Sequence, residues 1–369
     1  MRWFPGFLFL SLLATPSAAA DLDLLEDFVG ACGSEAVDVA AEVGRLSGAV
    51  PLPSGESLTS RSVHHPDLWF AEEHVIDTLG ALPRLEVVAE LVSGVDELHG
   101  VEVTLDGLRN IIVERVGSEP DLPAVVISAH LDSTAKADPG GWDPEADPAP
   151  GADDDASGVA AVMAIARAFA CWEAGFERTV RFVLFTAEEI GLQGSYAYVD
   201  GLPAGAEIDI VLQLDPVGFN GGSADRLWFS YDGRWPESTA LVEQAAEFQG
   251  TYLTVQGVHR DLLGAQAERS DHFPFWEAGY RALHFGAYPP PPDYHKKTDT
   301  LEVVDPVFLE EVTSVILGLA AARATPLPPN TLTEAGCSCD HRAAGKSRWI
   351  GWFGLWFALV LAPRARRRR

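Results

Sequence analysis

Imidazole and carboxylate side chains recur in a fixed order along this sequence, most of them close behind an apolar run. The set comprises His130, Asp132, Asp154, Glu188, Glu189, Asp215 and His295. Imidazole and carboxylate together suit Zn²⁺, and two such ions held close together need a shared carboxylate to offset their mutual repulsion. The ordered set therefore predicts a hydrolase with two metal ions.

Each member of the set also has an ordinary structural explanation. The aspartates before Ala156 could cap a helix N-terminus, the Glu188 and Glu189 pair could be a solvated strand end, and His295 could be a loop histidine. Only a fold that brings all of these side chains together favours a metal centre over the separate explanations.

Strands and helices are predicted to alternate along most of the chain. Apolar runs of strand length cover 108–116, 124–128, 179–185, 208–214, 226–231 and 282–285, and helical patterns cover 157–172, 238–249 and 306–322. Continuous apolar runs indicate strands that are covered on both faces. We therefore expect an α/β fold, a three-layer sandwich in which a mostly parallel mixed sheet carries helices on both faces.

In a sheet of this kind, ligands bind beyond the carboxyl ends of the strands. His130, the Glu188 and Glu189 pair and Asp215 each follow a predicted strand, and Asp154 precedes a predicted helix. We therefore expect residues that are far apart in the sequence to meet at one edge of the sheet.

The motifs resemble those of the secreted bacterial zinc aminopeptidases of the leucyl aminopeptidase type, over roughly 61–324. The run 150–162 and the Leu-Gln-Leu-Asp segment that ends at Asp215 are especially similar. The resemblance implies a zinc exopeptidase-like fold with two co-catalytic zincs per chain. It also implies that the substrates are peptides with a free N-terminus.

Carried over residue by residue, the resemblance implies a role for each member of the set. The implied ligands are His130 and Asp215 at one zinc, Glu189 and His295 at the other, and Asp154 bridging both. Glu188 is then the implied general base, which takes a proton from a water activated by the two zincs.

Three further residues are expected near the site. Asp132 stands two residues after His130, so we expect its carboxylate to accept the second ring N–H of that histidine. Phe285 and Tyr294 could line an apolar substrate pocket. The residue preference of the family does not transfer, because 263–267 contains no cysteine or tyrosine where the resembling enzymes carry a disulfide-held tyrosine loop.

Both ends of the chain carry features of targeting segments. Residues 1–20 combine an early arginine, a short apolar stretch and small residues, which predicts a cleavable signal peptide. Residues 326–348 form a linker with a Cys-Ser-Cys motif, and 349–369 add a short apolar segment and an arginine cluster. This tail resembles the MYXO-CTERM type of sorting signal, with a membrane anchor as the alternative. We expect export to the cell surface or the medium, with membrane contact only through the tail.

Residues 61–325 between these ends are expected to form the zinc metallopeptidase domain. Residues 21–60 could be a removable propeptide or an elaboration that packs on the domain. Cys32 and Cys171 could form one disulfide or remain buried thiols. The sequence does not indicate the oligomeric state.

The charge of the chain disfavours one class of function. The sequence holds 26 basic and 54 acidic residues, for a formal net charge of −28. Such a surface repels nucleic acid, and a nucleic-acid-binding role is therefore disfavoured.

Two other kinds of function stay open at the level of sequence. A glutaminyl cyclase or a carboxypeptidase-type zinc enzyme would use the same fold, but the cyclases use one zinc, and no pocket for a substrate carboxylate is evident. A non-enzymatic surface receptor built on a degenerate peptidase domain would lack ligands, and here no ligand is missing.

Overall fold

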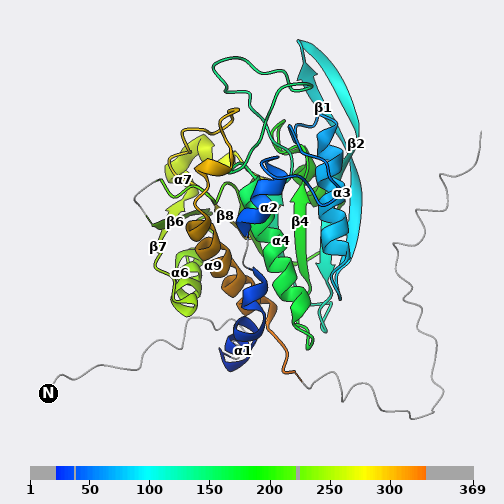
Figure 1. The fold of residues 1–369 in the computed structure, drawn as a ribbon. Coiled ribbons are helices and arrows are strands. Elements are labelled where there is room, and N and C mark those ends of the chain that lie inside the picture. Colours follow the sequence, from blue (N-terminus) through cyan, green and yellow to red (C-terminus); the bar gives the residue numbers. More distant parts are fainter. Residues whose placement is uncertain (1–21, 37–38, 222–224, 330–369) are drawn as a thin grey trace, which may run out of the picture. The chain divides into compact units, whose positions relative to one another are not determined.

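An eight-stranded mixed sheet forms the centre of the computed structural model, which describes residues 22–36, 39–221 and 225–329 (Figure 1). The strand order is β1-β2-β4-β3-β5-β8-β6-β7. The four central strands β4, β3, β5 and β8 run parallel to one another, and the strands next to them, β2 on one side and β6 on the other, pair with them in antiparallel fashion. Strand β1 pairs antiparallel with β2, and β7 pairs parallel with β6. The strands are β1 (Glu86–Leu98), β2 (Val101–Arg115), β3 (Ala124–His130), β4 (Val180–Phe185), β5 (Ile208–Leu214), β6 (Arg226–Tyr231), β7 (Thr254–His259) and β8 (Ala282–Phe285).

Helices cover both faces of this sheet. Along β3, Val125 and Ile127 belong to the larger apolar core, whereas Val126 between them belongs to a smaller one. Because successive strand residues point to opposite faces, the two cores lie on opposite sides of the sheet. The larger core takes in α1, α2, α3, α4, α6 and α9, the smaller one takes in α5 and α8, and the expected three-layer sandwich is confirmed. The α-helices are α1 (Leu22–Cys32), α2 (Val39–Leu46), α3 (Asp67–Gly80), α4 (Ala156–Cys171), α5 (Gln193–Gly201), α6 (Ser238–Gln249), α7 (Arg260–Leu263), α8 (His272–Glu277) and α9 (Pro306–Ala324).

Helix α4 packs directly behind the carboxyl ends of the central strands. It begins after Asp155, whose side chain accepts a hydrogen bond from the Gly158 N–H at 3.0 Å and so caps the helix. A Cβ atom at Gly158 would lie 2.5 Å from the carbonyl oxygen of Leu214, at the end of β5. Glycine at this position therefore lets the start of the helix approach the strand end closely.

Most of the predicted elements agree with the structure, and the largest difference is a hairpin. The bounds of β5, β6, β8 and α6 are as predicted, and those of β3, β4, α4 and α9 differ by one or two residues. The predicted strand 108–116 is the second half of the longer β2, which pairs with β1 along nearly its whole length. Strand β1 was not predicted, because it is an edge strand with mostly exposed or half-buried side chains and has no continuous apolar run.

The N-terminal segment 22–60 packs into the same core as the rest of the domain. In α1, the side chain of Phe28 is fully buried against Phe169 and Phe176, with ring centroids 5.4 Å away in each case. Cys32 at the end of α1 forms a disulfide with Cys171 at the end of α4, so these two cysteines do pair. The segment is therefore tied to α4 both by packing and by a covalent bond.

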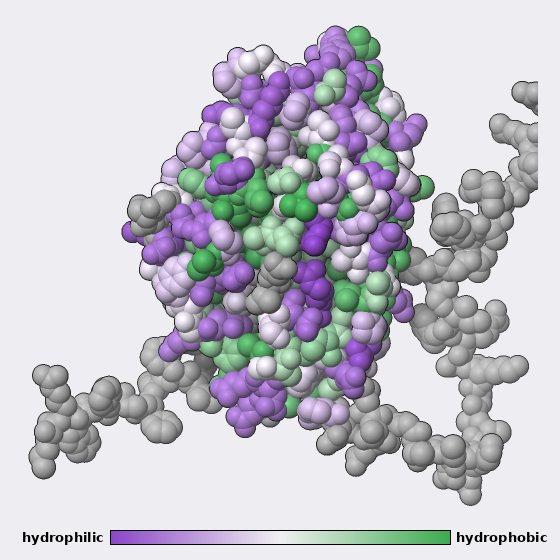
Figure 2. All heavy atoms as spheres, viewed as in Figure 1, coloured by the Kyte–Doolittle hydropathy of each residue, from purple (hydrophilic) through white to green (hydrophobic). Residues whose placement is uncertain are grey.

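The expected signal peptide and the C-terminal tail lie outside the described residues. Within those residues, no helix is both long and apolar enough to cross a membrane. The face drawn in Figure 2 is mostly hydrophilic, with smaller hydrophobic areas between the polar ones. This surface agrees with the excess of acidic residues in the sequence.

The disulfide leads to a prediction about stability. Replacing Cys32 and Cys171 together by alanine should lower the free energy of unfolding by about 2–5 kcal/mol, because the bond closes a long loop in the unfolded chain. Urea denaturation of both proteins, with and without reductant, measures this difference. Reductant should destabilise the wild-type protein and leave the double variant unchanged. Alkylation of Cys32 and Cys171 themselves in the unreduced, unfolded wild-type protein, located by peptide mass spectrometry, would contradict the pairing.

Candidate metal centre

The residues expected to bind metal meet at the carboxyl ends of the central parallel strands. His130 is the last residue of β3, Asp215 directly follows β5, and Glu189 lies in the turn after β4. Asp154 precedes α4, and His295 lies in the loop after β8. Five positions that span 166 residues of sequence thus reach one edge of the sheet.

Asp154 lies between the two histidines and turns one carboxylate oxygen toward each. His130 Nε2 is 3.1 Å from Asp154 Oδ1 and 3.5 Å from Asp215 Oδ1. On the other side, His295 Nε2 is 3.1 Å from Asp154 Oδ2 and 3.1 Å from Glu189 Oε2. The geometry therefore consists of two groups of one histidine and two carboxylates, and the groups share Asp154.

The hydrogen bonds and charges around His130 indicate whether this cluster fits a bound cation. Its Nδ1 lies 3.0 Å from the main-chain oxygen of Asp132, which can only accept a hydrogen bond, so Nδ1 carries the ring proton. The lone pair of Nε2 in the neutral ring then faces the oxygens of Asp154 and Asp215. Burial alone would lower the pKa of His130, but Asp215 and Glu188 outweigh it and raise that pKa well above its usual value. The ring must either take a second proton or bind a cation at Nε2.

The group around His295 also favours a positive charge. Burial lowers the pKa of His295, but its contacts with Asp154 and Glu189 raise the value to about 9. Oε1 of Glu189 is buried without a hydrogen-bond partner in the described part of the chain, while Oε2 receives Lys136 Nζ at 3.0 Å. Imidazole and carboxylate together form the donor set that zinc prefers, so the residues present fit the zinc that the resemblance in sequence implies.

Three consecutive aspartates before α4 have three different partners. Asp153 accepts the N–H of Gly218 at 2.7 Å, and Asp155 caps α4 and accepts the main-chain N–H of His130 at 3.1 Å. The N–H groups of Asp153 and Asp154 donate to the two carboxylate oxygens of Asp299, at 2.9 and 3.0 Å. The neighbours of Asp154 thus take structural roles, and its own carboxylate is left to face the two histidines.

Arg61 is a supporting residue that the sequence did not single out. Its side chain is fully buried, and its guanidinium donates to the carbonyls of Leu131 at 2.8 Å, Leu46 at 2.7 Å, Pro150 at 2.7 Å and Gly151 at 3.0 Å. Burial lowers its pKa to about 10, so the group stays charged at neutral pH. One side chain thus joins the N-terminal segment, the end of β3 and the loop that carries Asp154.

Glu188 is buried beside both groups. A carboxylate oxygen of Glu188 lies within 4.8 Å of ligand atoms of His130 and Glu189. In the described part of the chain its carboxylate has no hydrogen-bond partner, and burial is the largest cause that raises its pKa well above the usual value. Ala187 before it has a left-handed φ of 57°, which turns the chain out of the direction of β4. Glu188 and Glu189 are therefore neighbours in a turn and not in a straight strand.

The carboxylate of Asp132 has different partners from those expected. It accepts the main-chain N–H groups of Glu188 at 3.1 Å and Glu189 at 3.2 Å. Its Oδ1 lies 3.7 Å from His130 Nδ1, and the ring N–H goes to the main-chain oxygen of Asp132 at 3.0 Å. Because β3 ends at His130, Asp132 no longer follows the strand alternation on which the prediction depended. Asp132 therefore orients the ring through its backbone and the glutamate turn through its side chain.

An apolar pocket of about 110 Å³ adjoins Asp215. Tyr294 lines it, and its ring also stacks on His295 at a centroid distance of 3.7 Å. Phe285 does not line it, so that prediction was wrong. The side chain of Phe285 is fully buried in the core, where it packs on Phe229, and Phe229 is the residue that reaches the pocket. The pocket is lined by Asp215, Pro216, Trp228, Phe229, Ser230, Val258, Leu263, Gln266, Arg269, Ser270, His284, Gly286, Ala287, Tyr288, Pro290 and Tyr294.

A comparison with family profiles identifies the family to which this fold belongs. The sequence profile of peptidase family M28 matches residues 110–320, which is more than half of the chain. The protein therefore belongs to peptidase family M28.

Two curated relatives illustrate the similarity in sequence. Aminopeptidase YwaD of Bacillus subtilis is 29% identical over 209 residues, which cover 53% of this chain and 40% of that protein. A vacuolar membrane protease of Candida dubliniensis is 28% identical over 204 residues, which cover 53% of this chain and 19% of that protein. The chain thus spans between a fifth and two fifths of the length of these relatives.

Solved structures share the fold at lower identity. The LapA aminopeptidase of Legionella pneumophila superposes with a TM-score of 0.63 at 17% identity, over 89% of this chain and 81% of that one. The glutaminyl cyclase of Porphyromonas gingivalis superposes with a TM-score of 0.57 at 18% identity, over 83% of this chain and 100% of that one. At these identities, both similarities establish the fold alone.

The buried guanidinium leads to a prediction about the support of the site. Replacing Arg61 by methionine removes the donor of four carbonyls, and an unsatisfied buried group costs about 1–3 kcal/mol. The free energy of unfolding should fall by at least about 3 kcal/mol, as measured by urea denaturation. Arg61→Lys, which keeps a charged donor, should lose less. The matched control, Arg226→Met at an exposed position, should change stability by less than about 0.5 kcal/mol. An unchanged Arg61→Met protein would contradict the role.

Proposed function

We propose that this protein is an aminopeptidase with two zinc ions, which hydrolyses N-terminal residues from peptides. The observation that carries the proposal is the Asp154 carboxylate, which turns one oxygen to His130 and the other to His295. Each histidine has a second carboxylate beside it, Asp215 for one and Glu189 for the other. Two equivalent ligand groups with a shared carboxylate suit a pair of ions.

In this proposal, His130, Asp215 and Asp154 hold the first zinc, and Glu189, His295 and Asp154 hold the second. Zinc bound there would lower the pKa of a coordinated water and polarise the scissile carbonyl. The main-chain oxygen of Asp132 keeps the His130 lone pair directed at the first position by accepting the other ring N–H. The side chain of Asp132 holds the turn that carries Glu189.

Glu188 is the proposed general base. It is not needed as a ligand, because each ion already has three protein groups. Its buried carboxylate has a raised pKa, which suits a group that takes a proton from water and then passes it to the leaving amine. Glu188 thus carries the proton from the attack of water to the departure of the amine.

The apolar pocket is the proposed site for the side chain of the N-terminal residue. It adjoins Asp215, and Trp228, Val258 and Tyr288 contribute apolar surface to its lining. A volume of about 110 Å³ suits a single apolar side chain of medium size. We therefore expect peptides with residues such as leucine at the N-terminus to be preferred.

A glutaminyl cyclase of the same fold is the second candidate, because such an enzyme superposes on this chain. The cyclases use one zinc and would not need the second group of His295 and Glu189. Secretion and surface attachment remain predictions from the two ends of the sequence.

The reaction can be tested with chromogenic substrates. The purified protein should release p-nitroaniline from leucine p-nitroanilide and leave the N-acetylated substrate intact, because the amine must be free. Chelation should abolish activity, and two equivalents of zinc per chain should restore it. Full activity at one equivalent, together with cyclisation of an N-terminal glutamine, would replace the proposal by the cyclase.

The roles of the two adjacent glutamates can be separated by mutation. Glu188→Gln should keep both zincs and lower kcat by about 10²–10⁴-fold, because proton transfer is lost and binding is not. Glu189→Gln should lose affinity for one of the two ions. Zinc content by mass spectrometry and steady-state kinetics distinguish the two outcomes. An exchange of these phenotypes between the variants would contradict the assignment.

A further inference from the structure

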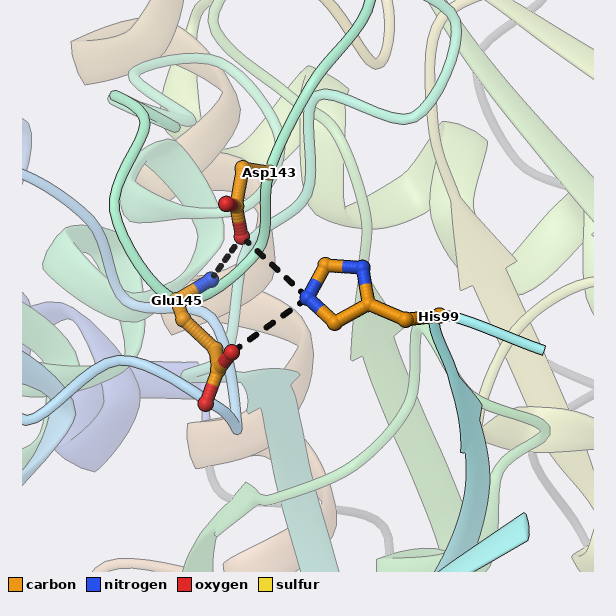
Figure 3. A group of neighbouring side chains, drawn as sticks. All are labelled: His99, Asp143 and Glu145. Carbon is orange, nitrogen blue, oxygen red and sulfur yellow. Dashed lines mark hydrogen bonds and ion pairs between the residues drawn. The ribbon is translucent and has the colours of Figure 1, made fainter. Parts of the chain in front are cut away.

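A second group of ligand-type side chains lies outside the centre described above. His99, Asp143 and Glu145 converge on one point at the surface, as Figure 3 shows. His99 Nε2 lies 3.3 Å from Glu145 Oε2 and 3.9 Å from Asp143 Oδ1. The three ligand atoms lie within 4.8 Å of one another.

The three residues come from two segments that are separated in the sequence by β2 and β3. His99 and Gly100 form the turn between β1 and β2, with positive φ values of 52° and 79°. Asp143 and Glu145 lie in the long loop between β3 and α4. Just before its tip, the hairpin is held to the domain by His64, whose Nε2 lies 2.7 Å from Asp96 Oδ2. Beyond this contact, the tip of the hairpin meets the loop between β3 and α4 where His99 contacts Asp143 and Glu145.

The distances suit a coordinated cation. Zinc binds imidazole nitrogen and carboxylate oxygen at about 2.0–2.2 Å, which places ligand atoms roughly 3–3.6 Å apart around one ion. The observed 3.3 Å already lies in this range, and 3.9 Å needs only a small rotation of an exposed side chain. The side chains of His99, Asp143 and Glu145 are 59%, 46% and 54% exposed, so water can complete the coordination.

The local charge also favours a cation. In the described part of the chain, the two carboxylates form ion pairs with His99 and with no lysine or arginine. The nearby cations are engaged elsewhere, since Lys297 contacts Asp147 and Lys136 contacts Glu189. An imidazole beside two carboxylates that no lysine or arginine neutralises suits a divalent ion, and the nitrogen ligand favours zinc over calcium or magnesium.

The group spans the walls of a cavity of about 320 Å³ beside the main centre. Leu98 and His99 of the hairpin line this cavity together with Trp142 and Pro144 of the loop. At its inner end the cavity reaches Asp132 and Glu189. An ion held at the surface group would therefore join the two walls near the opening.

We propose that His99, Asp143 and Glu145 form an additional binding site for a divalent cation of the zinc type. It is separate from the central pair and weaker, because it has three exposed ligands. The bound ion ties the tip of the hairpin to the loop after β3. It thereby restrains the wall of the cavity that leads to Glu189.

The test compares zinc binding in three proteins that carry their tightly bound metal. Wild type, His99→Gln and the control His259→Gln, at a half-buried histidine elsewhere on the surface, are titrated with zinc chloride by isothermal titration calorimetry. Wild type and His259→Gln should bind one more equivalent than His99→Gln, or bind it at least about tenfold more tightly. Glu145→Gln should also weaken this equivalent. The comparison does not depend on the activity or on the number of ions in the central site.

Hydrogen exchange supplies a second readout. Added zinc should slow exchange of the amides at the hairpin tip in wild type and in His259→Gln, and should leave His99→Gln unchanged. Equal stoichiometry and affinity in wild type and His99→Gln would overturn the proposal. Protection of the tip that persists without His99 would overturn it as well.

Discussion

The structure depends on the burial of several carboxylates and two imidazoles at the ends of four parallel strands. Removing a carboxylate from water costs several kcal/mol unless positive charge and hydrogen bonds compensate for it. Asp154 and Asp215 are both buried, and Asp154 faces both histidines. The histidines alone supply this compensation only when each takes an extra proton. Bound cations would supply it without those protons, so that several buried carboxylates could share one small volume.

The surroundings of the centre serve to hold these groups in place. Asp299 binds two main-chain N–H groups of the aspartate loop, and Arg61 binds four carbonyls around it. One of these carbonyls belongs to Leu46 in the N-terminal segment, which is also joined to α4 by the disulfide of Cys32. We infer that residues 22–60 stay with the domain and are not a removable propeptide, because their loss would expose Arg61 and part of the core.

The two sides of the centre differ in character. The apolar pocket adjoins Asp215, whereas the cavity under the hairpin reaches Glu189 and Lys136 and contains His64 and Asp96. Asp154 lies between these two ends. In the proposed reaction, the apolar side takes the side chain of the first residue, and the polar side receives the remainder of the peptide, which carries amide groups throughout.

Much of the fold and the chemistry of the site follow from local patterns in the sequence. Continuous apolar runs mark the strands that are buried on both faces, and the ligand-type residues stand close behind those runs. The pairing of Asp154 with both histidines was expected from resemblance, and the structure brings these side chains together. The exposed edge strand β1, by contrast, has no such run, because one of its faces is open to water.

Contacts between segments that are distant in the sequence were decided only by the tertiary structure. Arg61, Asp299 and the pair of cysteines have no local pattern that reveals their partners, since each partner lies far away in the sequence. Asp132 and Phe285 show the limit of local rules. Because β3 ends at His130, the side chain of Asp132 does not follow the alternation of the strand. The packing of β8 against β6 places the side chain of Phe285 in the core. Residue type and spacing thus determined which chemistry is available, whereas chain packing determined which atoms face one another, because those distances depend on long-range contacts.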